Sequence, residues 1–77
     1  MARKTFGTLE AISAVVPKEG GGYYAAIATN VIGSPDKPRF NKVLEEQSFQ
    51  RASEADDAAA VQLTHLKGVD GEGGLVW

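Results

Sequence analysis

The side chains that most often carry out enzyme chemistry are scarce in this chain of 77 residues, which contains one histidine and no cysteine. The common zinc sites use several histidine or cysteine ligands, so the chain lacks the ligands for them. The histidine, His65, also has no partner base or second metal ligand close to it in the sequence. We interpret it as a surface residue near the end of a helix, where a positive charge interacts favourably with the helix dipole.

Neighbouring carboxylates occur at two places, and neither arrangement suits a pair that acts as acid and base. Asp56 and Asp57 would diverge by about 100° on a helix, and Glu45 and Glu46 would point to opposite faces of a strand. The glycines at 20–22 lack the spacing of a phosphate-binding loop, and no Gly-Lys-Ser or Gly-Lys-Thr follows them. We therefore predict a protein that is not an enzyme and that has no catalytic residue, cofactor or metal.

Four aromatic side chains could stack on the bases of single-stranded nucleic acid: Phe6, Tyr23, Tyr24 and Phe49. Such a site needs lysine or arginine interleaved with the aromatics, and the strand that carries the tyrosines has neither. The formal net charge of −2 also argues against general binding of phosphate. We interpret the aromatics as core or interface residues, with Tyr24 as a candidate interaction residue.

Composition places the chain among ordinary globular domains, with 43% hydrophobic and 23% charged residues. No apolar run approaches the ~20 residues that span a bilayer, and Glu10 interrupts the only stretch that resembles a signal peptide. We therefore predict a cytoplasmic protein without a membrane segment. Residues 1–40 carry five basic and three acidic groups, and residues 41–77 carry three basic and seven acidic groups. Most such asymmetry reflects an ordinary solvated surface, and the alternative is a dipolar molecule that pairs with copies of itself or with a partner.

A helix is predicted over 53–67. Ser53 can serve as its N-cap, and Asp56 stands three residues later in the position of a shortened capping box. Gly68 follows as the glycine that commonly ends a helix. At 100° per residue, one apolar stripe contains Ala55, Ala58, Ala59, Leu63 and Leu66.

Three strands are predicted before this helix. The first covers 5–16 and ends at Pro17; its apolar spacing also fits a helix, but Gly7 and the β-branched content favour a strand. The second covers 23–32, between glycine-rich turns. The third covers 40–51 and pairs antiparallel with the second, although helix remains an alternative there.

The expected fold is an α+β domain over 1–68, a three-stranded antiparallel meander packed by one C-terminal helix, with room for a short fourth strand at the C-terminus. Segment 5–16 has apolar side chains on both sides, whereas a sheet covered on one side alternates apolar and polar residues. Something must therefore cover the second face. The tail at 69–77 is acidic and glycine-rich, which predicts a mobile segment. Its apolar end could cover this face, and a second copy of the chain is the alternative.

These features lead us to expect a non-enzymatic protein–protein interaction module, with an accessory or regulatory role, that associates as a homodimer. The candidate interaction residues are Tyr24, Leu75, Val76 and Trp77. The last three could instead complete the core, or they could dock into a pocket of an unidentified protein partner.

The order of three strands and an alanine-rich helix that follows Ala52 and Ser53 resembles the end of double-stranded-RNA-binding domains. It is also similar to small antitoxin-type domains. This resemblance of architecture implies a nucleic-acid-binding regulatory domain as the alternative function. Double-stranded-RNA-binding domains carry a basic cluster at the start of that helix, whereas this chain has Glu54, Asp56 and Asp57 there. Nucleic acid is therefore the less favoured partner.

Overall fold

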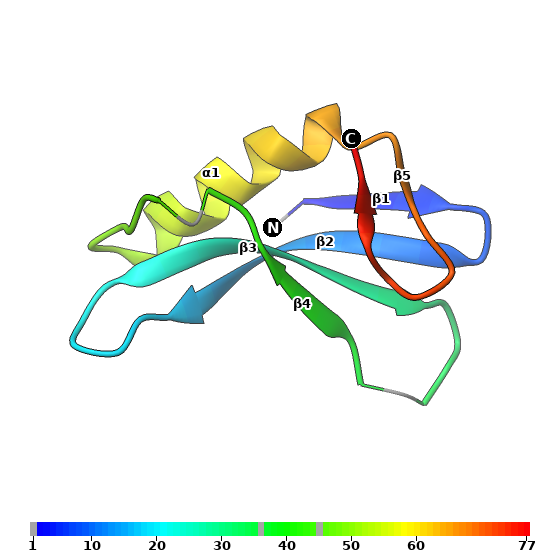
Figure 1. The fold of residues 1–77 in the computed structure, drawn as a ribbon, viewed down its shortest axis with the longest axis horizontal. Coiled ribbons are helices and arrows are strands. Elements are labelled where there is room, and N and C mark those ends of the chain that lie inside the picture. Colours follow the sequence, from blue (N-terminus) through cyan, green and yellow to red (C-terminus); the bar gives the residue numbers. More distant parts are fainter. Residues whose placement is uncertain (1, 36, 45) are drawn as a thin grey trace.

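A four-stranded antiparallel sheet with one helix across it forms the body of the molecule (Figure 1). The computed structural model describes residues 2–35, 37–44 and 46–77. The elements in chain order are β1 (Arg3–Phe6), β2 (Leu9–Pro17), β3 (Tyr23–Val31), β4 (Arg39–Lys42), α1 (Ala52–His65), β5 (Gly68–Val69) and β6 (Leu75–Val76). The predicted α+β class is confirmed. The order and number of strands differ, because the sheet contains β1 to β4 and a separate β5–β6 hairpin follows the helix.

The predicted first strand is two strands joined by a turn at Gly7. Gly7 has φ 63°, and Phe6 pairs with Leu9 across the two-residue turn. Glycine adopts this left-handed conformation readily at the first central position of such a turn. Since the chain reverses here, Phe6 lies on the helix side of the sheet and packs against the core.

The core lies between α1 and the face of β2 and β3 that it covers. Its buried members are Ala11, Ala25, Ile27, Val43, Ala59, Leu63 and Leu66. Alternate residues of β3 point to the opposite face, and two of them, Ala26 and Ala28, are buried as well. These alanine side chains are small, and two larger side chains lie beside them. Tyr24 is on β3 itself, and Phe40 on β4 is the partner of Ala28.

The predicted strand at 40–51 is correct only at its start. β4 ends at Lys42, and Leu44 adopts a left-handed backbone with φ 55°. This conformation turns the chain out of the sheet, so that Phe49 returns to form only a single bridge with Tyr23. Residue 45, which the predicted strand included, lies outside the described residues.

The N-cap of α1 is not the predicted Ser53. Arg51 occupies the N-cap position without a side-chain hydrogen bond, and Ser53 lies inside the first turn. Asp56 serves the contact between helix and sheet instead, because its Oδ1 accepts a 2.8 Å hydrogen bond from the hydroxyl of Ser13 on β2. The buried Ser13 hydroxyl in turn accepts the backbone N–H of Ala2.

The C-terminus of α1 also differs from the prediction. Leu66 is the C-cap in an extended conformation, and Gly68 belongs to β5 rather than to a left-handed helix end. A lysine from the sheet satisfies the carbonyl at this end, since Lys4 Nζ donates to the oxygen of Leu66 at 2.7 Å. Among the described residues, no helix has the length and apolar character needed to cross a membrane.

The glycine-rich segment expected to be a mobile tail forms the β5–β6 hairpin. Asp70 organises its turn, because one carboxylate oxygen accepts the backbone N–H groups of Glu72 at 2.9 Å and Gly74 at 2.8 Å. These hydrogen bonds lower the pKa of Asp70 below its ordinary value. Val69 and Leu75 pack against the core. The hairpin therefore lies on the α1 side of the sheet (Figure 1).

Candidate functional site

The face of the sheet opposite α1 carries several large apolar side chains. Strand alternation and the register of β2, β3 and β4 assign it four large apolar side chains, Ile12, Val16, Tyr24 and Phe40. Alanines at 14, 26 and 28 lie among them. We call this surface the open face.

Phe40 is the most exposed of these side chains. It stands at 56% exposure on the short edge strand β4, beside Ala28, while Ile12, Val16 and Tyr24 are half-buried. A shallow hollow of about 300 Å³ lies between Phe40 and the end of β2, where its lining includes Val16 and Pro17. The open face therefore presents a projecting ring next to a recess.

Charged side chains border the open face. Arg3 Nε and Glu10 Oε2 form an ion pair at 3.3 Å on neighbouring strands. Around Tyr24, the ammonium groups of Lys42 and Lys18 lie 4.7 Å and 5.9 Å from the ring centroid, within the range of cation–π attraction. These lysines could not be recognised from the tyrosine's own strand, because they come from β4 and from the β2–β3 loop.

The structure does not bring the predicted interaction residues together. Tyr24 lies on the open face, whereas Leu75 packs against the core on the α1 side. Val76 and Trp77 are about half exposed near the end of α1, where the backbone N–H of Lys67 donates to the carbonyl of Val76. The C-terminal segment thus leaves the open face uncovered in the part of the chain that the structure describes.

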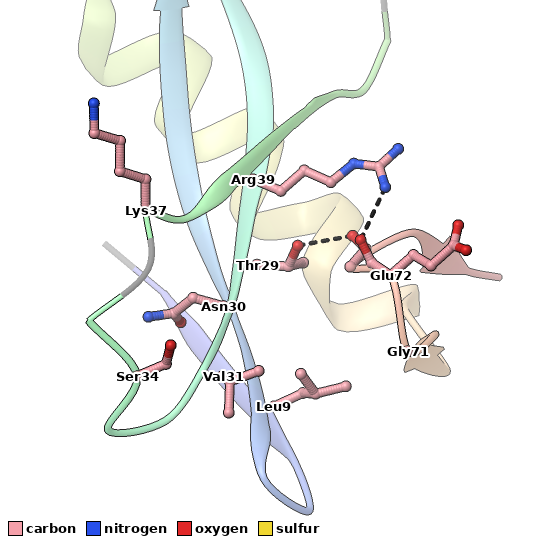
Figure 2. A pocket seen from close by; sticks show the side chains of 10 residues that line it. Leu9, Thr29, Asn30, Val31, Ser34, Lys37, Arg39, Gly71 and Glu72 are labelled. Carbon is pink, nitrogen blue, oxygen red and sulfur yellow. Dashed lines mark hydrogen bonds between the residues drawn. The ribbon is translucent and has the colours of Figure 1, made fainter.

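Side chains from β3 and β4 fasten the hairpin to the sheet (Figure 2). The buried hydroxyl of Thr29 donates to the carbonyl of Gly73 at 2.7 Å, and Arg39 donates to the carbonyl of Glu72 at 3.0 Å. A small pocket of about 150 Å³ lies at this junction. Figure 2 shows the Lys37 side chain pointing away from the hairpin, so its ammonium group does not join these polar groups. These hydrogen bonds therefore have a structural role, which is to hold the β5–β6 hairpin against β3 and β4.

The titratable groups considered as catalytic candidates lie apart. His65 and Asp57 are exposed on α1, and Asp56 is engaged with Ser13 at the contact between helix and sheet. Within residues 2–35, 37–44 and 46–77, no three side chains of histidine, aspartate or glutamate gather where they could hold a metal ion. The open face is the candidate site that combines exposed apolar area with bordering charge.

Comparison of the chain with models of protein families, with curated proteins and with solved structures finds no significant match.

Proposed function

We propose that the chain is a non-enzymatic interaction module that associates with itself through the open face. The observation that supports this proposal is the combination of Phe40, 56% exposed, with Ile12, Val16 and Tyr24 on a sheet face that α1 and the β5–β6 hairpin both leave uncovered. Contiguous apolar surface of this kind marks protein interaction sites. A sheet with apolar side chains on both faces is stable when both faces are covered.

The small size of the chain strengthens the need for a second cover. A domain of about 60–80 residues buries only roughly 60% of the surface of its unfolded chain, so its own core is marginal. Here α1 supplies only a few large side chains to the core, Leu63 and the following Leu66, while the N-terminal half of its buried stripe is alanine. Apolar burial on the open face would add stability that the single chain lacks.

The experiment compares two surface substitutions of the same kind. Phe40→Glu introduces a charge on the open face, whereas Val61→Glu introduces the same charge at an equally exposed site on α1. Light scattering coupled to size-exclusion chromatography should give a dimer for the native chain and for Val61→Glu, and a monomer for Phe40→Glu. Equal masses for the two variants would contradict the proposal.

A second candidate function, single-stranded nucleic-acid binding, is favoured by the ammonium groups of Lys18 and Lys42, which lie 5.9 Å and 4.7 Å from the centroid of the Tyr24 ring. Aromatic rings flanked by cations can stack on bases while the lysines contact phosphates. Fluorescence anisotropy of a labelled oligonucleotide tests this function. Binding at ~50 mM salt that weakens steeply as salt rises would support it, and the absence of binding at that salt would exclude it.

A further inference from the structure

We infer that two copies pair with their open faces toward each other across a two-fold axis, so that the Phe40 ring of each copy packs against the Val16–Pro17 side of the hollow in the other. This inference rests on the proposed self-association and specifies which surface of the second copy is the partner. The alternatives are the outer surface of α1 and the edges of the sheet.

The available area is on the scale that a stable dimer needs. Four strands about 4.8 Å apart, the longest of nine residues at about 3.3 Å each, give an open face on the order of 500 Å² in projection. The accessible area of a corrugated face is larger, and a standard interface buries about 800 Å² per partner. The molecule also exposes 4969 Å², whereas a compact monomer of its mass is expected to expose about 4500 Å².

The shape of the open face suits a copy of itself. Phe40 forms one wall of the hollow, and Val16 and Pro17 form the opposite wall. A two-fold axis repeats every contact, so one ring entering one hollow implies the reciprocal contact. Sheets packed face to face interdigitate side chains in this way.

The outer surface of α1 is a poorer partner for the open face. It carries the exposed carboxylates Glu54 and Asp57, with Val61 as the one large apolar side chain of α1 more than half exposed. Lys42 would attract these carboxylates, but exposed ion pairs contribute little in water. Burying the carboxylates against Phe40 would remove their hydration without a matching set of donors. Apolar burial therefore favours the second open face.

The edges of the sheet are also poor partners. β1 carries the charged side chains of Arg3 and Lys4, and Pro38 precedes the four-residue strand β4. Charges, proline and short length are the features that discourage strand pairing at an edge. Between the open face, the outer surface of α1 and the sheet edges, the open face carries the largest number of large apolar side chains.

Site-specific photo-cross-linking tests the arrangement. Phe40→p-benzoylphenylalanine keeps an aromatic ring at the contact and captures the carbon–hydrogen bonds next to it, and Val61→p-benzoylphenylalanine is the matched control on α1. Irradiation should convert the position-40 variant to a covalent dimer, with the cross-link in residues 12–17 or 40–42 of the second copy. The position-61 variant should remain uncross-linked.

The outcomes separate this inference from the proposed function. If Phe40→Glu disperses the dimer but the position-40 cross-links fall within 52–65 of the second copy, self-association through the open face stands and the face-to-face arrangement is overturned. Cross-links within 3–6 would overturn it equally, in favour of an edge contact. If neither variant cross-links and the native chain is monomeric, both the inference and the proposed self-association are overturned.

Discussion

Replacing Phe40 by alanine should separate association from folding. The ring is 56% exposed in the single chain, so little of its apolar area contributes to the stability of the monomer. Truncation there is expected to cost the monomer less than about 1.5 kcal/mol. The same exposed area is what association would bury, and its loss should appear mainly in the dimer dissociation constant.

The expected size of the effect follows from the exposed area of Phe40. A phenylalanine buries roughly 200 Å² when it is fully covered, so 56% exposure leaves on the order of 110 Å² for the interface. At about 25 cal/mol per Å², this area corresponds to about 2.8 kcal/mol per copy. Two copies contribute about 5.6 kcal/mol, which corresponds to a rise in Kd of about ten-thousandfold.

Sedimentation equilibrium at several concentrations measures this change. Phe40→Ala should shift the monomer–dimer equilibrium strongly toward monomer, while circular dichroism remains that of the native fold. Val61→Ala on α1 is the control and should leave Kd unchanged. A change in Kd of less than tenfold for Phe40→Ala, in a folded variant, would refute the assignment of this ring to the interface.

Three further predictions concern the fold. Ser13→Ala removes the donor to Asp56, and urea unfolding should show a loss of about 1–3 kcal/mol that a double-mutant cycle with Asp56→Ala assigns to this pair; full additivity would contradict the pairing. Gly7→Ala should lower the unfolding free energy by about 1–2 kcal/mol, because φ is positive there although a Cβ meets no neighbour; unchanged stability would contradict the turn geometry. Since the folded pKa of Asp70 is lowered, its contribution is present above the ordinary value of 3.8 and is lost as the pH falls through the folded value. Asp70→Asn should therefore remove that part of the acid dependence in thermal unfolding, and identical acid profiles of the two proteins would contradict it.

The parts of the fold that could be predicted are those encoded by local pattern. The helix with its buried Ala55, Ala59 and Leu63 follows from the 3.6-residue period of its apolar residues. The turn at Gly7 had a signal as well, since a glycine followed by one residue between apolar stretches is typical of a two-residue hairpin. It was missed because the apolar run on both sides suggested one strand.

The C-terminal hairpin could not be predicted from the composition of its segment. Asp70 followed by glycine is a strong turn signal, but the glycine-rich and acidic character of the segment favoured a mobile tail. The hairpin is held in place by residues that are distant in the sequence, because Thr29 and Arg39 donate hydrogen bonds to the carbonyls of its turn. Such hydrogen bonds depend on how β3 and β4 are placed, which the local sequence does not specify.

The candidate site was predicted in kind but not in detail. Apolar residues on both sides of the predicted first strand indicated a second apolar face, and the register of β2 and β3 assigns Ile12, Val16 and Tyr24 to the face opposite α1. The tail was wrongly offered as a cover for that face, because the hairpin packs on the α1 side. Phe40 was not predicted as an interaction residue, because its place on this face depends on the strand register that pairs it with Ala28.

The mass of the native chain in solution tests the central claim most directly. The account predicts that sedimentation equilibrium, followed from low to high micromolar concentration, gives a mass that rises from 8.1 kDa to twice that value. It also predicts a plateau there, because a face-to-face pair about a two-fold axis closes on itself. A mass that stays at 8.1 kDa throughout, or that rises without a plateau, would contradict the account.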